Sequence, residues 1–311
     1  MSSCTTSPST PPGSGPWTRT SASSSRSSRD PRASRRITSA RCEVTNVEDG
    51  ASPNARHHYV ASPVPWLAGC SDRGRRHPTN QDALNLAARD LAVRQAVLVV
   101  SDGVSTAHGS ERASLIAAET ACSTLMGALS GPGPDAKAFR AAFGHAHEAV
   151  LAAAPEGEAS ACTLVAAAVQ GSRLLVGSIG DSRAYWFGDD GATWQLTQDD
   201  SMAQARMMLG MAREEAEASL QAHSITRWLG RNASDVTPAL VELRPPSAGW
   251  LLLCSDGLWN YASAPDALRA VLEYQTRGRE TLVAIVEALA TWANDLGGRD
   301  NITVALLRHE L

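Results

Sequence analysis

Two stretches of the sequence repeat one pattern, in which a run of apolar residues ends abruptly in Ser-Asp-Gly. The first occupies residues 97–103 and ends with Asp102 and Gly103; the second occupies residues 251–257 and ends with Asp256 and Gly257. A short apolar run is typical of a buried strand, and a glycine after it permits a sharp turn and leaves its carbonyl group accessible. The pattern predicts two carboxylates held with little freedom at strand ends.

Two further aspartates stand in similar surroundings. Asp82 closes the segment Asn-Gln-Asp at residues 80–82, and Asp300 lies in Gly-Gly-Arg-Asp-Asn at residues 297–301, so an amide side chain stands directly beside each. Several rigidly held aspartates without His or Cys partners suit hard divalent cations with oxygen ligands. Mg²⁺ or Mn²⁺ is therefore expected rather than Zn²⁺.

By composition, the chain of 311 residues divides into a tail and one domain. Residues 1–62 are rich in Ser, Thr, Pro and Arg and nearly lack clustered apolar residues, so they cannot bury enough surface to offset the chain entropy lost on folding. We expect a disordered tail there and one folded domain at 63–311, because a hydrophobic content of 43% supports a sizeable core. A transit peptide, or a translation start assigned too early, is an alternative interpretation of the tail.

Charge and cysteine usage exclude several classes of protein. The net charge of −4 argues against a nucleic-acid-binding protein. No apolar segment follows Met1 and no run of eighteen apolar residues occurs, so neither a signal peptide nor a membrane span is expected. Six scattered cysteines without Cys-x-x-Cys spacing indicate reduced thiols. We expect a cytoplasmic protein, and its single lysine and abundant alanine are typical of GC-rich bacteria.

Hydrophobic periodicity predicts an α+β domain. Strands are expected at 66–71, 82–86, 97–100, 162–169, 174–179, 185–187, 194–196, 241–243, 250–254 and 302–307, and helices at 110–130, 137–154, 265–274 and 280–296. Residues 201–228 are expected to form a helical surface flap. The strand order favours antiparallel sheets packed as a β-sandwich, with helices on both outer faces in four α-β-β-α layers.

Three strand connections carry specific expectations. The tight turn at 170–173 predicts a hairpin of strands 162–169 and 174–179. Residues 185–187 are expected to continue the second strand of this hairpin beyond Asp181. Strands 241–243 and 250–254 are expected to pair antiparallel around Pro245 and Pro246.

Eight motifs, taken in order, resemble those of metal-dependent serine/threonine protein phosphatases, the protein phosphatase 2C (PPM) family in its bacterial form. They lie at residues 74–82, 101–104, 162–166, 180–185, 196–201, 225–230, 252–258 and 298–304, and the match spans 66–308. One Asp-Gly pair is a weak signal, whereas eight motifs in the right order and spacing are specific. The resemblance implies a helix-flanked β-sandwich with a binuclear Mn²⁺ or Mg²⁺ centre at one end.

The resemblance also implies roles for individual residues. Asp102 would bridge the two ions and the Gly103 carbonyl would bind one of them. Asp256 and Asp300 would hold the other ion, and Asp82 would contact the centre directly or through water. Asp181 matches an acid that, with Asp256, holds a third and weaker ion in bacterial members.

The implied reaction is hydrolysis of phosphoserine and phosphothreonine. Two metal ions activate a water molecule and neutralise the phosphoryl oxygens, so no covalent enzyme intermediate is needed. The implied partners are phosphorylated proteins, namely a serine/threonine kinase and its substrates.

The sequence departs from the family pattern near the site. His77 stands where the family usually places an arginine that clamps the substrate phosphate, so His77, Arg76 or Arg75 would take that role. Gln81 replaces a glutamate found in some members, and residues 105–106 are Ser-Thr where paired glycines are usual. These departures leave open a second hypothesis, a catalytically weak or inactive member that binds phosphoproteins or regulates a partner.

Other interpretations of single residues also stay open. Each aspartate taken alone fits a turn, and Asp181 has Arg183 nearby as a possible ion-pair partner. Cys70 and Arg76 have the Cys-x5-Arg spacing of cysteine phosphatases, in which a thiolate attacks the phosphate. Only one glycine lies between them, the residue directly before Cys70 is not a histidine, and no helix is expected at 78–82 to present amides to an anion.

Overall fold

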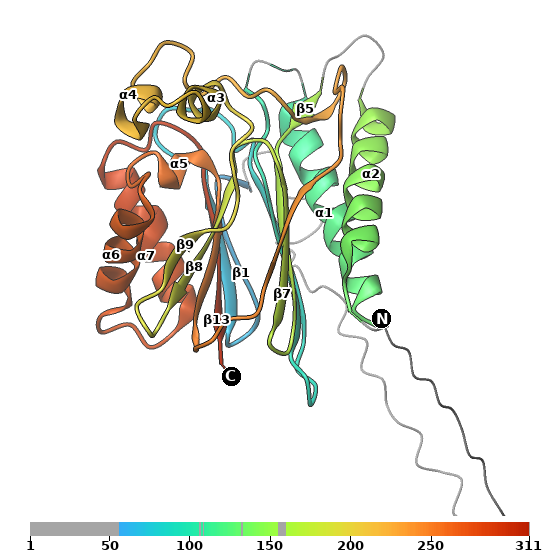
Figure 1. Ribbon diagram of the computed structural model, residues 1–311, viewed down its shortest axis with the longest axis vertical. Helices are drawn as coiled ribbons and strands as arrows, with labels where there is room; N and C mark the ends of the chain where they lie inside the picture. The colour runs from blue at the N-terminus through green and yellow to red at the C-terminus, as the bar shows by residue number, and fades with distance from the viewer. Residues whose placement is uncertain (1–55, 106, 108, 132, 155–159, 311) are drawn as a thin grey trace, which may run out of the picture. The chain divides into compact units, whose positions relative to one another are not determined.

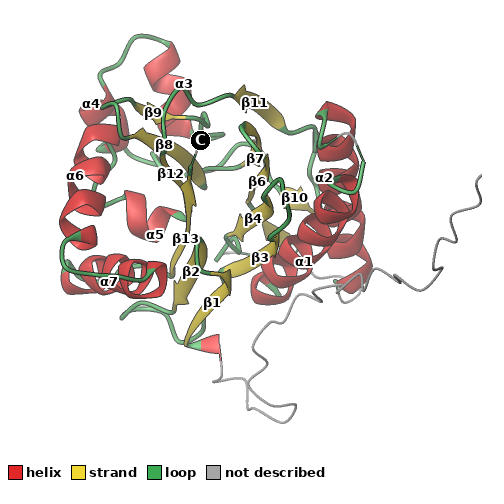
Figure 2. Cartoon of the chain, turned by 90° about the horizontal axis from the view of Figure 1, so that it is seen from below, coloured by secondary structure: helices red, strands yellow, loops and turns green. Residues whose placement is uncertain are grey.

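The computed structural model describes residues 56–310, except 106, 108, 132 and 155–159. Within this part, two antiparallel sheets pack face to face, and helices cover the outer face of each (Figures 1 and 2). The six-stranded sheet has the order β1-β2-β13-β12-β8-β9, and the five-stranded sheet has the order β11-β7-β6-β4-β3. The expected four-layer α-β-β-α arrangement is confirmed.

The elements have the following bounds. The six-stranded sheet contains β1 (His58–Val64), β2 (Leu67–Asp72), β8 (Arg183–Gly188), β9 (Thr193–Gln195), β12 (Gly249–Cys254) and β13 (Ile302–His309). The five-stranded sheet contains β3 (Ala83–Arg89), β4 (Gln95–Ser101), β6 (Leu164–Gln170), β7 (Arg173–Ile179) and β11 (Ala239–Leu243). A separate pair consists of β5 (Ala161–Cys162) and β10 (Leu229–Gly230). The helices are α1 (Ser110–Ala128), α2 (Ala136–Ala153), α3 (Met202–Met208), α4 (Arg213–Glu217), α5 (Asp256–Trp259), α6 (Pro265–Thr276) and α7 (Leu282–Asp295).

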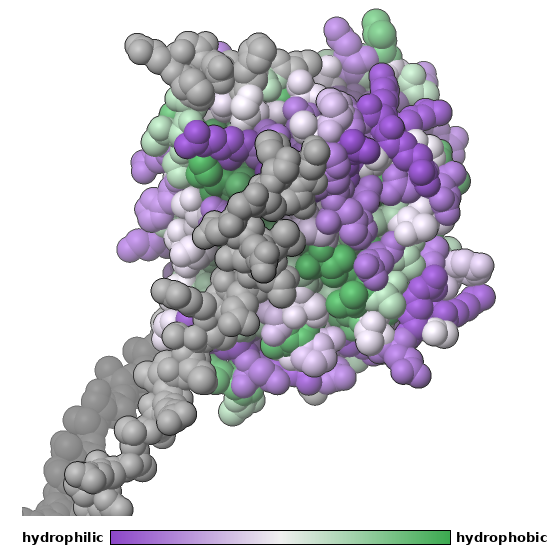
Figure 3. Space-filling model, turned by 180° about the vertical axis from the view of Figure 1, so that it is seen from behind, coloured by the Kyte–Doolittle hydropathy of each residue, from purple (hydrophilic) through white to green (hydrophobic). Residues whose placement is uncertain are grey.

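Side-chain alternation along the strands explains the layers. On β4, Val99 lies in the core shared with α1 and α2, whereas its neighbour Leu98 lies in the core between the sheets. On β12, Leu253 faces the other sheet and Leu252 faces α6 and α7. Because successive strand residues point to opposite faces, each central strand is apolar on both. On the part of the face that is coloured in Figure 3, apolar residues form small patches among hydrophilic ones.

Two expectations about strand pairing are wrong. Strand β11 pairs with β7 and β12 pairs with β8 and β13, so they belong to different sheets and are not partners. The link between them contains Pro245 and Pro246, which have no N–H group to extend a ladder. Strand β8 does not continue β7 either, because the chain turns at Gly180, with φ of 98°, and crosses to the six-stranded sheet.

The first described strand lies partly in the range assigned to the tail. Strand β1 pairs with β2 in the register His58↔Asp72 and Tyr59↔Ser71, so residues 58–62 belong to the sheet. The expectation of disorder otherwise falls on residues 1–55, which lie outside the described residues.

The segment 201–228 forms two short helices, α3 and α4, joined by turns, rather than a continuous helix. It has a small core of its own, built on Ala203, Ala216 and Ala222. None of the helices described in the structure has the length and hydrophobicity needed to cross a membrane.

Candidate metal centre

Strand register places the predicted acids at one end of the sandwich. In the five-stranded sheet, Ala83 pairs with Ser101, so Asp82 before β3 and Asp102 after β4 are neighbours. Strand β7 ends at this same edge and is followed by Asp181. In the six-stranded sheet, Cys254 pairs with Val304, which brings Asp256 and Asp300 to the corresponding edge. This is the end at which α5 lies in Figure 1.

A buried hydroxyl group joins the two sheets at this end. Ser255 Oγ donates to Asp82 Oδ2 at 2.7 Å and accepts from the backbone N–H of Thr303 at 3.0 Å. Thr303 Oγ1 is hydrogen-bonded to Ser71 Oγ at 2.8 Å, and the Ser71 hydroxyl accepts from Asn80 Nδ2 at 2.9 Å. Because Ser255 reaches Asp82 from the other sheet and is itself held by Thr303, this chain of hydrogen bonds orients the Asp82 carboxylate.

The loops that carry the other acids are equally constrained. The backbone N–H of Asp102 donates to Thr163 Oγ1 at 3.0 Å. A Cβ atom on Gly103 would lie 2.7 Å from the carbonyl oxygen of Gln81, and one on Gly257 would lie 2.0 Å from that of Asn301. Glycine is therefore required after both aspartates by close backbone approach, not by backbone dihedral angles.

Two of these carboxylates, Asp82 and Asp256, form no ion pair with a basic side chain among the described residues. Asp82 Oδ1 and Asp256 Oδ1 are buried without a hydrogen bond. Burial raises the pKa of Asp82 to about 6, with a further contribution from the charge of Asp300. Burial, followed by the charges of neighbouring aspartates, raises the pKa of both Asp102 and Asp256 well above the usual range. Unpaired buried carboxylates that repel one another are costly unless a cation or protons compensate them.

These residues fit a divalent cation by their chemistry. The donor set is a group of aspartates without a thiol or imidazole, which suits Mn²⁺ or Mg²⁺. Within the described residues, no three His, Cys, Asp or Glu side chains stand close enough together to hold one ion. The fit therefore rests on the unpaired oxygens and on the mutual repulsion of the carboxylates, not on coordination geometry.

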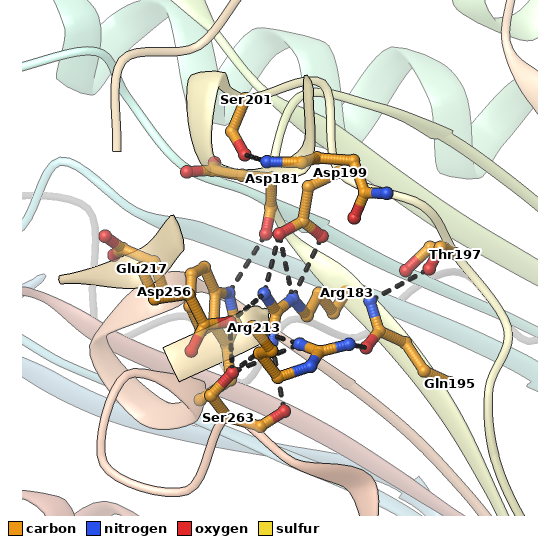
Figure 4. Close-up of polar contacts among 12 residues, drawn as sticks. Asp181, Arg183, Gln195, Thr197, Asp199, Ser201, Arg213, Glu217, Asp256 and Ser263 are labelled. Atoms are coloured by element: carbon orange, nitrogen blue, oxygen red, sulfur yellow. Dashed lines mark hydrogen bonds and ion pairs between the residues drawn. The ribbon is translucent and has the colours of Figure 1, made fainter. Parts of the chain in front are cut away.

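Asp181 lies beside a buried arginine but does not pair with it. Arg183 forms its ion pair with Asp199, with Nη2 at 2.7 Å from Oδ2 (Figure 4). Its guanidinium stacks 3.5 Å from the ring centre of Trp259. Trp259 Nε1 in turn donates to the backbone carbonyl of Asp181 at 3.0 Å. Burial, followed by the charge of Asp199, raises the pKa of Asp181 to about 7. The Arg183 alternative for Asp181 is thus wrong.

The same arginine ties the flap to the site. Glu217, at the end of α4, accepts from Arg213 at 3.1 Å and lies 3.5 Å from Arg183 Nη2. Figure 4 shows these groups converging with Ser263, whose backbone carbonyl accepts from Arg183 Nη1 at 3.2 Å. The segment 201–228 is therefore anchored next to Asp181 by a polar cluster in which Arg183 and Asp199 are buried and Arg213 and Glu217 are partly buried.

The three candidates for binding the substrate phosphate are placed differently. His77 Nε2 lies 3.3 Å from Asp300 Oδ1, at the rim of the carboxylate cluster. Arg75 is directed away to the end of α7, where it donates to the Asn294 carbonyl at 2.9 Å and pairs with Asp295. Arg76 is exposed. The structure thus brings His77 to the site and engages the Arg75 side chain elsewhere.

The cysteine-phosphatase alternative does not fit the structure. Cys70 lies in the middle of β2 and is 0% exposed, packed in the core with α7. Burial raises the pKa of its thiol to about 12. A neutral thiol inside a sheet cannot attack a phosphate.

Sequence reasoning missed the residues that hold the acids in place. Ser255, Thr163 and Asn301 lie inside the eight motifs, but the sequence alone indicates no role for them. Asn301 Oδ1 accepts from the Gln81 N–H at 2.7 Å, and its amide donates to the Arg73 carbonyl at 2.7 Å. A polar residue next to each aspartate was the available signal, because such residues at strand ends often bond to neighbouring backbone.

Comparison with known proteins agrees with this geometry. A family model described as protein phosphatase 2C matches residues 71–292. The serine/threonine phosphatase stp of Listeria innocua is 30% identical over 252 residues, which cover 78% of this chain and 94% of that protein. The protein phosphatase PhpP of Streptococcus pneumoniae is 30% identical over 247 residues, which cover 76% and 94%.

Solved structures show the same fold. The PPM Ser-Thr phosphatase MsPP from Mycobacterium smegmatis, in complex with cacodylate, is 31% identical with a TM-score of 0.62, and the match covers 78% of this chain and 97% of that one. The catalytic domain of the phosphatase PstP, in complex with two manganese ions, is 26% identical with a TM-score of 0.61, covering 81% and 98%. The chain belongs to the protein phosphatase 2C family of metal-dependent serine/threonine phosphatases.

Proposed function

We propose that this protein hydrolyses phosphoserine and phosphothreonine in proteins at a binuclear Mn²⁺ or Mg²⁺ centre. The observation that carries the proposal is the convergence of Asp82, Asp102, Asp181, Asp256 and Asp300 from both sheets at one end of the sandwich. Two of these acids have buried oxygens without a partner. Membership of the family supports the same activity.

Each acid has a proposed role as a metal ligand. Asp102 and the Gly103 carbonyl would hold one ion, and Asp102 would also bridge to the second, which Asp256 and Asp300 hold. Asp82, oriented by Ser255, would contact the centre directly or through water. Asp181, with Asp256, would hold a third and weaker ion. When bound, the two metal ions would supply the nucleophilic water and neutralise charge on the phosphoryl oxygens.

The residues of the chain then orient the substrate and exclude competing chemistry. His77, held 3.3 Å from Asp300 at the rim of the cluster, would face the phosphoryl oxygens as a hydrogen-bond donor. Arg76 is the second candidate for this contact, because the guanidinium of Arg75 is already bound at the end of α7. Cys70 is not available as a nucleophile, since it is buried and protonated.

The biological partners are part of the proposal. We propose that the substrates are a serine/threonine kinase and the proteins that it phosphorylates, and that the enzyme works in the cytoplasm without binding nucleic acid or membranes. The formal net charge of −4 and the buried, protonated thiols support this assignment.

The test is hydrolysis of p-nitrophenyl phosphate and of a phosphothreonine peptide in EDTA, Mg²⁺ or Mn²⁺. We expect activity that requires the metal and is lost in Asp102→Asn. The matched control is Asp266→Asn, which changes an exposed aspartate at the start of α6 and should retain activity. Calorimetric titration of the wild type with Mn²⁺ measures the number of sites. If the folded protein shows no turnover with any metal, the proposed phosphatase activity is refuted and a phosphoprotein-binding or regulatory role is favoured.

A further inference from the structure

Two arginines flank the His77–Asp300 pair without partners of their own. Arg76 precedes His77 and Arg299 precedes Asp300, and both residues are exposed. Among the interactions of the described residues, neither guanidinium takes part in a hydrogen bond or an ion pair. Two free cations therefore stand one residue away from a pair of side chains at the edge of the metal centre.

The backbone holds these two arginines on the same rim. The N–H of Arg75 donates to the Gly298 carbonyl at 2.8 Å, and Asn301 Nδ2 donates to the Arg73 carbonyl at 2.7 Å. A Cβ atom on Gly74 would lie 2.1 Å from the Asp300 carbonyl oxygen. The segments 73–77 and 298–301 thus run against each other, which places the exposed Arg76 and Arg299 on neighbouring stretches of backbone.

Neighbouring arginines lack this freedom. Arg73 donates to the Pro78 carbonyl at 3.4 Å, and Arg75 is bound to the end of α7. Arg56 donates to the backbone carbonyl of Asp82 at 2.5 Å and lies 3.7 Å from Glu111. Because the adjacent carboxylates Asp295 and Asp300 pair with Arg75 and His77, no acid of the rim is left for Arg76 or Arg299.

We propose that Arg76 and Arg299 form a subsite for anionic side chains next to the phosphorylated residue of the substrate. The inference rests on the proposed phosphatase function and adds a substrate class, phosphopeptides with flanking Asp or Glu or with a second phosphorylated residue. Guanidinium groups bind carboxylate and phosphate groups through paired N–H donors. An exposed cationic rim also speeds the encounter with anionic peptides.

The experiment compares phosphothreonine peptides that differ only in their flanking residues, with Ala, Asp, Lys or phosphoserine on each side. The measured quantity is the ratio of kcat/KM for each charged peptide to that for the alanine peptide. An exposed ion pair gives about a twofold to fivefold effect, so two arginines that act independently should favour the acidic peptide by about fourfold to 25-fold. The preference should weaken as salt rises.

Charge reversal tests the two residues directly. In Arg76→Glu and Arg299→Glu the ratio for the Asp peptide should fall below one and that for the Lys peptide should rise above one. The matched control, Arg140→Glu, reverses an exposed arginine of α2 and should keep the wild-type ratios. A gain with phosphoserine but not with Asp would assign the subsite to a second phosphate group.

Equal ratios for all flanking residues in the wild type, or unchanged ratios in both variants, would overturn the subsite. Hydrolysis of p-nitrophenyl phosphate separates this outcome from failure of the phosphatase function, because it requires no flanking contact. If nothing is hydrolysed, the binding affinities of the same peptides, fluorescently labelled, are measured by anisotropy. The ratio of the affinity for each charged peptide to that for the alanine peptide then tests the subsite.

Discussion

Acidification should stabilise the metal-free protein, although most proteins lose stability in acid. Asp82 and Asp181 have pKa values raised from 3.8 to about 6 and about 7, mainly by burial. For an acid whose pKa is higher in the folded state, the folded protein binds more protons, so stability is lowest above the raised pKa. It increases as pH falls through that value.

The magnitude follows from these two carboxylates. Between about pH 7.5 and about pH 5.5, proton binding favours the folded state by about 1 kcal/mol at Asp82 and about 2 kcal/mol at Asp181. Neither is a main source of the other's shift, so the two add to about 3 kcal/mol. Asp102 and Asp256, whose pKa values are also raised, act in the same direction. His309, whose pKa is lowered by burial, opposes them below its ordinary value of 6.5.

The assay is thermal unfolding in EDTA at constant ionic strength across this pH range. A gain of about 3 kcal/mol corresponds to a rise in Tm of about 6 to 12 °C for a domain of this size. With saturating Mn²⁺ the sign should reverse, because protons compete with the cation for the carboxylates.

Two variants test the assignment to these carboxylates. Asp181→Asn cannot titrate and should show a higher metal-free Tm at about pH 7.5 with a smaller rise on acidification. The exposed Glu119→Gln should behave as the wild type. A Tm that falls on acidification in EDTA, or an undiminished rise in Asp181→Asn, would refute the reasoning.

Three further changes probe the packing and chemistry of the site. Gly257→Ala puts a Cβ atom 2.0 Å from a backbone oxygen and should lower the free energy of unfolding, measured in urea, by about 1 to 3 kcal/mol or more. The control Gly144→Ala, whose Cβ atom would meet nothing within 4 Å, should be neutral or stabilising. Ser255→Ala removes the donor to Asp82. It should lower the free energy of unfolding by about 1 to 3 kcal/mol and weaken Mn²⁺ binding measured by calorimetry. An unchanged stability and an unchanged Mn²⁺ affinity would exclude the role of Ser255 in joining the sheets. His77→Arg offers a two-donor contact and should tighten inhibition by inorganic phosphate several-fold, whereas weaker inhibition would remove His77 from the phosphate site.

The acids of the site could be predicted because their signals are local. Apolar runs at 97–100 and 251–254 specify β4 and β12, and the following Asp-Gly places a carboxylate at each strand end. Side-chain alternation and the Asp-Gly pair involve only a few neighbouring residues, so the sequence alone shows them. The motif order adds Asp300 in the same way.

Strand partners could not be predicted with the same success. The sequence pattern of residues 239–243 is compatible with a strand beside β12 or beside β7, because a local pattern predicts a strand but not its pairing partner. In the structure these residues pair with β7. The choice of Asp199 rather than Asp181 by Arg183 also depends on tertiary packing, since the stacking on Trp259 sets the direction of the guanidinium.

The division of the acids between the two sheets connects the metal centre with the stability of the fold. Asp82, Asp102 and Asp181 extend from the five-stranded sheet, whereas Asp256 and Asp300 extend from the six-stranded sheet. Without cations, the charged carboxylates repel one another across this junction, and the Ser255 hydroxyl is a direct link between the two groups. Cations bound between them would replace repulsion by attraction at one end of the sandwich. The ions that supply the chemistry would therefore also act as a cross-link between the two sheets.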